Sequence, residues 1–250
     1  MIESLIKARL DKTIGGRYLN IGSGEGDLDL DINEYCQELY ACDINESDVL
    51  FSKKNNPNIS YTLQDAERLE YEDNFFDTVV CMEVIEHVNN KEKVINEINR
   101  VLKPRGYLII TFPSDNYPFT YDPLNYILRN INIKFPIGAH SFGHLDLIKD
   151  DEINKLFNEY NFEIIDKKYL SRYISSIFEM YWIGFLQKVL KKNSNNSIDN
   201  IKPDNFYLRP NHPIVSNFWL TNLINYFDEF FILNNSIKSV GLGYLLKKKF

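Results

Sequence analysis

Short apolar runs alternate with segments of helical periodicity over the first two thirds of the chain. The apolar runs lie at residues 18–21, 38–42, 59–63, 76–82 and 106–112. Between the last two runs, Val94, Ile95, Ile98 and Val101 recur at three- and four-residue spacing, which predicts a helix over 91–102. Because this alternation is typical of βαβ units, we expect an α/β fold whose parallel sheet is covered on both faces.

The pattern changes after residue 112. Residues 113–145 are rich in Pro, Tyr, Asn and His and predict an irregular excursion over the carboxyl ends of the strands. The later expected elements are, in order, a helix over 150–160, a strand over 162–169, an aromatic amphipathic helix over 171–191, a polar loop over 191–200, a second aromatic helix around 218–233 and a returning strand over 241–250.

One junction between a strand and a turn carries the clearest chemical signal. The apolar run 18–21 leads into Gly22, Gly24 and Gly26. Glycine lets the backbone turn sharply and approach a ligand closely, because it has no Cβ. Asp43 ends the next apolar run, roughly 20 residues further on, where a carboxylate can accept hydrogen bonds from ribose hydroxyls. The G-x-G-x-G spacing differs from the G-x-G-x-x-G of dinucleotide-binding proteins and so disfavours a nicotinamide enzyme.

Further motifs follow this loop in a fixed order. The ordered stretches are 20–26, 41–43, 63–69, 76–88 and 102–108. Together they resemble the class I S-adenosylmethionine-dependent methyltransferases, of the methyltransferase type 11 and ubiquinone-pathway O-methyltransferase kind. The resemblance covers most of residues 15–170 and the terminal strand. It implies a doubly wound, mostly parallel seven-stranded sheet with an antiparallel last strand. We therefore divide the chain into a cofactor-binding core (1–170), a helical insertion (171–240) and a final core strand (241–250).

The resemblance implies S-adenosylmethionine as cofactor and assigns its contacts. The expected cofactor-binding residues are Asn20, Gly22, Ser23, Gly24, Gly26, Asp43, Ile44, Asp65, Ala66 and Glu83. Asp65 would face the adenine amino group, although it could instead be a turn or helix N-cap residue. Glu83 would flank the methionine moiety and the methyl acceptor. Asn20 departs from the family pattern, which usually has an acidic residue there, so we expect weaker cofactor binding.

An E-x-x-E-H string raises the question of a metal ion. Glu83, Glu86 and His87 would lie within one helical turn and offer oxygen and nitrogen ligands suited to Mg²⁺ or Mn²⁺. The string resembles the metal-binding stretch of ubiquinone-pathway O-methyltransferases and of small-RNA 2′-O-methyltransferases. It is also widespread in metal-free relatives, where these side chains pack beside the cofactor. We therefore predict no metal site. If a metal ion is bound, these three residues are its candidate ligands.

Two histidines lie on the irregular segment 113–145, which should cover the site. His140 or His144 could act as the general base that deprotonates an acceptor hydroxyl, and either could complete the metal set of the RNA enzymes. The structural alternative is a histidine that stabilises the loop through hydrogen bonds to backbone. We take His144 and His140 as the catalytic candidates.

The composition limits which binding partners and cellular locations are expected. The net charge of −7 disfavours nucleic acid and anionic membranes. No apolar run reaches the roughly 18 residues of a membrane-spanning helix, and the first residues are too polar for a signal peptide. The three cysteines lack metal-binding spacing, which favours reduced thiols and a cytoplasmic location. The 171–191 helix could be a lid, a substrate element, a dimer face or a peripheral membrane contact.

These observations converge on an enzyme. We expect methyl transfer to a hydroxyl group of a small molecule or glycan, with release of S-adenosylhomocysteine. The alternatives are a metal-assisted RNA 2′-O-methyltransferase and a catalytically silent cofactor-binding scaffold for a partner.

Overall fold

The computed structural model describes residues 16–114, 148–172, 181 and 239–250. Almost all of them belong to one compact unit, made of Met1–Ser114, Asp146–Leu170 and Gly241–Phe250, which contains nearly all of the sheet. The excursion beyond residue 114, the 191–200 loop and the helix around 218–233 lie outside the described residues. The role assigned to the 171–240 insertion therefore stays a prediction.

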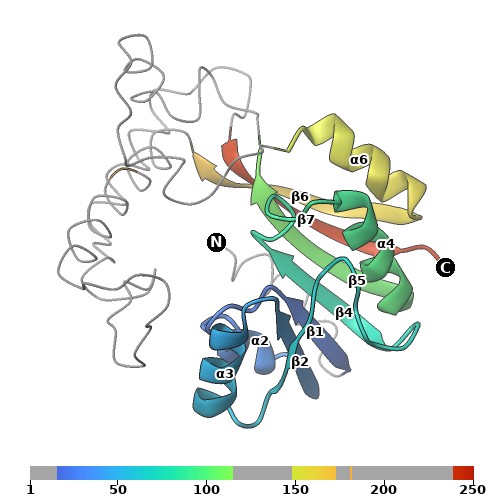
Figure 1. The fold of residues 1–250 in the computed structure, drawn as a ribbon. Helices are drawn as coiled ribbons and strands as arrows, with labels where there is room; N and C mark the ends of the chain where they lie inside the picture. The colour runs from blue at the N-terminus through green and yellow to red at the C-terminus, as the bar shows by residue number, and fades with distance from the viewer. Residues whose placement is uncertain (1–15, 115–147, 173–180, 182–238) are drawn as a thin grey trace. The chain divides into compact units, whose positions relative to one another are not determined.

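Within the described residues, seven strands form one sheet (Figure 1). They are β1 (Arg17–Ile21), β2 (Glu38–Asp43), β3 (Ser60–Leu63), β4 (Phe76–Met82), β5 (Leu102–Pro113), β6 (Phe162–Arg172) and β7 (Ser239–Lys248). Their order across the sheet is β3-β2-β1-β4-β5-β7-β6. The pairs β1–β2, β1–β4, β2–β3 and β4–β5 are parallel, whereas β7 runs antiparallel to β5. The predicted doubly wound, mostly parallel sheet with an antiparallel last strand is confirmed.

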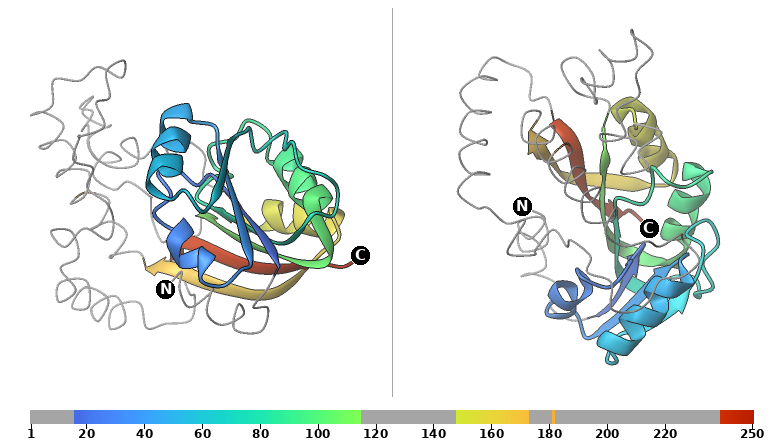
Figure 2. Two further views of the ribbon diagram at one scale, coloured as in Figure 1. Left: turned by 90° about the horizontal axis from the view of Figure 1, so that it is seen from below. Right: turned by 60° about the vertical axis from the view of Figure 1, so that its left-hand side comes forward.

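Helices cover both faces of this sheet (Figures 1 and 2). The described helices are α2 (Asp29–Asn33), α3 (Glu46–Asn55), α4 (Lys91–Val101) and α6 (Asp150–Glu159). Alternate residues of β1 enter two separate apolar clusters: Leu19 and Ile21 pack with residues of α4 and α6, and Tyr18 packs with residues of α2 and α3. Because side chains alternate along a strand, Asn20 shares the α2–α3 face with Tyr18.

The α4 helix shows how closely the apolar pattern determines an element. The side chain of Asn90 accepts a hydrogen bond from the backbone N–H of Lys93 at 3.0 Å and so caps the first turn. Val94, Ile95 and Ile98 are fully buried against the sheet. The helix ends at Val101, within one residue of its predicted end.

The boundaries of three strands, β5, β6 and β7, differ from prediction by two residues or more. β5 begins at Leu102, which pairs with Phe76, and the pairing register shifts between Phe76 and Thr78. Residues 103–106, which lie between the predicted helix over 91–102 and the apolar run at 106–112, are therefore an irregularity inside a continuous strand, with Arg105 in the left-handed region (φ +66°). β6 extends to Arg172, so residues 171–172 are strand and not the start of a helix. β7 begins two residues earlier than predicted, at Ser239.

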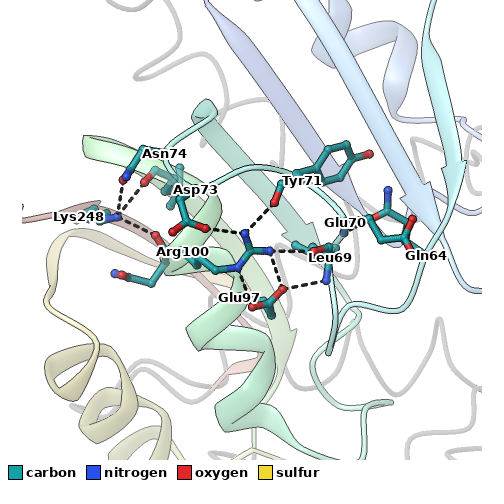
Figure 3. A network of polar contacts seen from close by, with 11 residues as sticks. Gln64, Leu69, Glu70, Tyr71, Asp73, Asn74, Glu97, Arg100 and Lys248 are labelled. Atoms are coloured by element: carbon teal, nitrogen blue, oxygen red, sulfur yellow. Dashed lines mark hydrogen bonds and ion pairs between the residues drawn. The ribbon is translucent and has the colours of Figure 1, made fainter.

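Buried polar contacts tie β7 to the end of α4 (Figure 3). The Nζ of Lys248 donates to Asn74 Oδ1 and to the carbonyls of Asn99 and Leu102, at 2.8–3.1 Å. Nearby, the guanidinium of Arg100 bonds the carbonyls of Leu69 and Tyr71 and the carboxylates of Asp73 and Glu97. These bonds join segments far apart in the sequence near the amino ends of β4 and β5.

Two further features of the described residues bear on the sequence predictions. Cys36, Cys42 and Cys81 are free thiols, as predicted, and the last two are buried. Among the described helices, none is both long and apolar enough to cross a membrane.

Candidate functional site

The loop after β1 is built from glycines in left-handed conformations. The φ angles are +72° at Gly22, +52° at Gly24 and +79° at Gly26. A Cβ on Gly22 would lie 2.2 Å from Cγ2 of Val84, whereas a Cβ on Gly24 would meet nothing within 4 Å. Gly22 is therefore required by both conformation and packing. Gly24 faces open space at the carboxyl edge of the sheet, where ligands of α/β proteins bind.

Asp43 is fixed in place by the backbone around it. Its Oδ2 accepts a hydrogen bond from the N–H of Gly24 and its Oδ1 from the N–H of Asn45, each at 2.8 Å. The N–H groups of Gly22 and Ser23 donate to the carbonyl of Cys42, which joins the loop to the end of β2. Each carboxylate oxygen of Asp43 retains acceptor capacity. The half-buried carboxylate thus presents two oriented acceptors beside the glycine loop.

The ends of β2 and β3 carry the residues expected near adenine. Ile44 follows Asp43 directly and is 71% exposed. Asp65 is exposed and forms a turn, in which its Oδ1 accepts from the N–H of Glu67 at 2.9 Å and its carbonyl accepts from the N–H of Arg68. Ala66 is buried at 8% exposure. The turn is the alternative that the sequence left open for Asp65, and an adenine contact there stays a prediction.

Glu83 stands at the end of β4. It has a left-handed backbone (φ +53°), its N–H donates to the carbonyl of Thr111, and its Oε1 accepts from Thr111 Oγ1 at 2.8 Å. Thr111 lies on β5, so two neighbouring strands hold this carboxylate at the sheet edge. The residue is exposed, which leaves it accessible to a ligand.

The rest of the E-x-x-E-H string forms a tight turn and not the expected helical turn. The side chain of Glu86 is fully buried, and burial together with the nearby charge of Glu83 raises its pKa to about 8. The Nε2 of the half-exposed His87 lies 3.7 Å from Glu86 Oε1. No three His, Cys, Asp or Glu side chains in the described parts of the chain form a group that could hold a metal ion, so these residues are not assembled as ligands.

Sequence reasoning missed a buried polar pair below the loop. The Nδ2 of Asn20 donates to Oδ1 of Asp29 at 2.6 Å, and the two residues are 3% and 0% exposed. Burial raises the pKa of Asp29, and the hydrogen bonds from Asn20 and Tyr61 oppose that shift. The available signal was an acidic residue at position 29, shortly after a glycine loop that lacks its usual acidic residue at position 20. Ser23 is also buried, and its hydroxyl has no hydrogen-bond partner among the described residues.

The strand order brings most of the predicted residues to one edge. The carboxyl ends of β3, β2, β1 and β4 are neighbours in the sheet. The predicted residues follow these strands in the same order along the edge. Asp65 and Ala66 follow β3, Asp43 and Ile44 lie at the end of β2, the loop 20–26 lies at the end of β1, and Glu83 follows β4. His140 and His144 lie outside the described residues, and their catalytic role stays a prediction.

Comparison with known proteins agrees with this architecture. Residues 19–110 match the family described as a methyltransferase domain. The ubiquinone/menaquinone biosynthesis C-methyltransferase UbiE of Pseudomonas aeruginosa (strain LESB58) is 35% identical over 41% of this chain and 44% of its own length. The ubiquinone biosynthesis O-methyltransferase of Rickettsia typhi is 29% identical over 60% of this chain and 61% of its own length. The chain thus spans less than two thirds of either relative.

Solved structures share the fold at low sequence identity. The 4+2 cyclase SpnF superposes with a TM-score of 0.64 at 16% identity, covering 99% of this chain and 79% of that one. Phosphoethanolamine N-methyltransferase 2 of Haemonchus contortus, solved with S-adenosyl-L-methionine, gives a TM-score of 0.55 at 16% identity, covering 94% of this chain and 49% of that one. Residues 19–110 thus match a methyltransferase domain, and the described sheet shares the fold of solved methyltransferase structures.

Proposed function

We propose that the protein transfers a methyl group from S-adenosylmethionine to a hydroxyl group of a small molecule or glycan. The observation that carries this proposal is the Asp43 carboxylate, which two backbone N–H groups orient beside the glycine loop. Its remaining acceptor capacity suits the two adjacent hydroxyls of a ribose. Hydrogen bonds to a charged group contribute about 1.5–3 kcal/mol each, enough to anchor a nucleoside.

The neighbouring residues fit the rest of the same ligand. The open space at Gly24 leaves room for a ligand against the backbone. Ile44 offers an exposed apolar side chain next to Asp43, which suits the face of an adenine ring. Asp65 and Ala66 follow the adjacent strand β3 and would lie at the adenine edge. Gly22, Ser23 and Asn20 would surround the methionine part of the ligand.

The protein forms no covalent bond to either reactant in this reaction. Bound S-adenosylmethionine supplies an electrophilic methyl group on a sulfonium. The chain's own residues hold and align the two reactants, and alignment alone can contribute about 7–11 kcal/mol to lowering the barrier. Glu83 is an exposed residue whose carboxyl group is held by Thr111 and Glu86, and it would lie beside the acceptor hydroxyl. His144 or His140 would remove the proton of that hydroxyl.

The net charge and the names of the relatives support the proposed acceptor class. A net charge of −7 opposes binding of a polyanion such as RNA. The Pseudomonas and Rickettsia relatives are ubiquinone-pathway methyltransferases, one acting at carbon and one at oxygen, and both names point to small organic acceptors. The fold alone does not decide the reaction, because a cyclase shares it.

The proposal is tested by identifying the atom to which the methyl group is transferred. The protein would be incubated with methyl-labelled S-adenosylmethionine and separate pools of phenolic small molecules, glycans and RNA. The labelled product would then be heated with hydriodic acid, which releases O-methyl groups as volatile methyl iodide and leaves C-methyl groups in place. We expect volatile label from the small-molecule or glycan pool. Label that stays non-volatile, or that enters RNA, would overturn the hydroxyl proposal.

A further inference from the structure

A buried serine of α3 holds the glycine loop from a distant part of the chain. Ser52 is completely buried, and its Oγ donates a 3.0 Å hydrogen bond to the carbonyl of Gly24, 28 residues earlier in the sequence. Alanine is the better helix former at such a position and would leave no hydroxyl to bury. The serine is therefore better explained by a requirement of the loop than by the packing of the helix.

Polar atoms of three side chains converge below Gly26. A Cβ on Gly26 would lie 2.7 Å from Oη of Tyr61 and 3.1 Å from both Nδ2 of Asn56 and Oγ of Ser52. The Nδ2 of Asn56 donates to Oη of Tyr61 at 3.2 Å, and Tyr61 is in turn hydrogen-bonded to Asp29 of α2. The loop thus rests directly on a network of polar side chains, and this close packing restricts where the hydroxyl of Ser52 can point.

Gly24 is the residue of the loop whose conformation packing does not determine. It has a left-handed backbone (φ +52°), and a Cβ there would meet nothing within 4 Å. Two hydrogen bonds, one on each side of its Cα, fix it instead: its N–H donates to Asp43 Oδ2 at 2.8 Å, and its carbonyl accepts from Ser52. Because glycine has wide conformational freedom, loss of the bond from Ser52 lets the Gly24 backbone rotate. The Asp43 carboxylate then loses one of the two N–H groups that orient it.

We propose that Ser52 is a positioning residue for ribose recognition. Through Gly24 it fixes the N–H group that orients the Asp43 carboxylate. The inference rests on the proposed function, since it requires Asp43 to bind the ribose of S-adenosylmethionine. It adds a fully buried residue of α3 to those on which cofactor affinity depends.

A double-mutant cycle tests whether Ser52 acts through Asp43. Calorimetry would measure the dissociation constant of S-adenosylhomocysteine for wild type, Ser52→Ala, Asp43→Asn and the double variant. Ser60→Ala, at an exposed serine of β3, makes the same exchange away from the loop and serves as the matched control. Thermal unfolding would establish that each variant is folded.

We expect Ser52→Ala to weaken S-adenosylhomocysteine about fivefold when Asp43 is present and by less than about twofold when Asp43→Asn is already made. Ser60→Ala should leave the affinity within about twofold of wild type. Equal losses from Ser52→Ala in the two backgrounds would show that Ser52 supports the loop without acting through Asp43. That result would overturn the inference, as would no loss in either background. A wild-type protein that does not bind S-adenosylhomocysteine would instead contradict the proposed function and the inference with it.

Amide hydrogen exchange in the ligand-free protein gives a second test, which decides the question if Asp43→Asn binds too weakly to measure. The N–H of Gly24 donates to Asp43, whereas the N–H of Gly22 donates to the carbonyl of Cys42. We expect Ser52→Ala to speed exchange at Gly24 at least about fivefold and to leave Gly22 within about twofold. Equal acceleration of both amides would show a general loosening of the loop, and unchanged exchange at Gly24 would show that Ser52 does not hold it. Either result would overturn the inference.

A second variant keeps both tests decisive if Ser52→Ala does not fold. Ser52→Cys keeps the shape of the side chain and replaces the hydroxyl with a thiol, a weak donor. It should shift the affinity and the exchange rate at Gly24 in the same directions as Ser52→Ala. A folded Ser52→Cys variant with wild-type affinity and wild-type exchange at Gly24 would overturn the inference.

Discussion

The Asp43 carboxylate is the residue on which cofactor binding depends most directly. Asp43→Asn keeps the size of the side chain but removes its charge and turns one acceptor into a donor. We expect the affinity for S-adenosylhomocysteine to fall at least about tenfold, because charged hydrogen bonds to the ribose contribute about 1.5–3 kcal/mol each. Calorimetry measures the change, with Glu46→Gln, an exposed neighbour in α3, as control. A loss of less than threefold in a folded variant would remove Asp43 from the site.

The buried Glu86 should make stability depend on pH. In the folded protein its pKa is about 8, and in the unfolded chain it is about 4.3. The native state therefore holds a proton that the unfolded chain has lost between these values, so stability falls as pH rises from about 4.3 to about 8.

Glu86→Gln removes this dependence because the amide is always neutral. We expect the variant to match wild type near pH 4 and to be more stable by at least about 1 kcal/mol at pH 8. Urea unfolding across this range gives the comparison, and Glu72→Gln, at an exposed position, should change nothing. A constant difference between Glu86→Gln and wild type at all pH values would show that Glu86 does not titrate in this window.

Individual residues could be predicted where their role is local. The left-handed glycines and the acidic end of β2 follow from positions in one short segment, and the structure places them as expected. The Asn20–Asp29 and Glu83–Thr111 bonds join segments whose meeting depends on the tertiary fold. An acidic residue at position 29 hints at the first bond, but its spacing from Asn20 does not show that the two side chains meet. For Glu83 and Thr111 the sequence carries no signal that distinguishes them from solvated polar side chains.

At the scale of the elements, alanine substitutions in the glycine loop test which glycines the loop requires. Gly24→Ala should cost about 1 kcal/mol of stability, because only the left-handed backbone opposes a side chain there. Gly22→Ala should cost clearly more, since its Cβ would also overlap Val84 Cγ2. Urea unfolding measures both losses.

A double-mutant cycle isolates the contact with Val84. Val84→Ala removes the overlapping methyl group, so the Gly22→Ala and Val84→Ala losses should be non-additive, and the double variant should be more stable than their sum predicts. Additive losses would show that the loop avoids Val84 by moving. The same cycle with Gly24→Ala should be additive and serves as control.

Element boundaries were predictable only where the apolar pattern decides them. The α4 helix has a capping Asn90 and a regular apolar stripe, and it ends within one residue of prediction. The Lys-Pro-Arg-Gly segment at 103–106 has the composition of a turn, yet Leu102 already pairs with Phe76 on β4. That pairing comes from a partner strand about 25 residues away, which local composition does not report.

At the scale of the whole molecule, Lys248 joins the end of the chain's last strand to the core. Its three hydrogen bonds reach Asn74 and the carbonyls of Asn99 and Leu102, and the residue is only 7% exposed. Lys248→Met should destabilise the protein by about 1–3 kcal/mol, because buried carbonyls lose their donor. Urea unfolding would show this, and Lys249→Met, at an exposed position, should be neutral. Equal effects of the two substitutions would mean that β7 is held by its strand pairing alone.

The overall topology could be predicted because the motifs occur in a fixed order along the chain. The run of strand, glycine loop, strand and acidic residue leads to the observed order β3-β2-β1-β4, and the terminal strand inserts antiparallel beside β5 as expected. The function of the 171–240 insertion, an association with membranes and a homodimer were not predictable in the same way. Such properties depend on surfaces that an aromatic, amphipathic pattern leaves open.

The central claim is that this edge of the sheet binds S-adenosylmethionine for methyl transfer to a non-polymeric acceptor or a glycan. The most direct measurement is the transfer of labelled methyl groups into a cell extract separated into small molecules, lipids, glycans, protein and RNA. Wild-type protein and Asp43→Asn would be compared in parallel. The account predicts label in the small-molecule or glycan fraction with wild type and little with Asp43→Asn. Label in RNA, or no label from a wild-type protein shown to bind the cofactor, would contradict it.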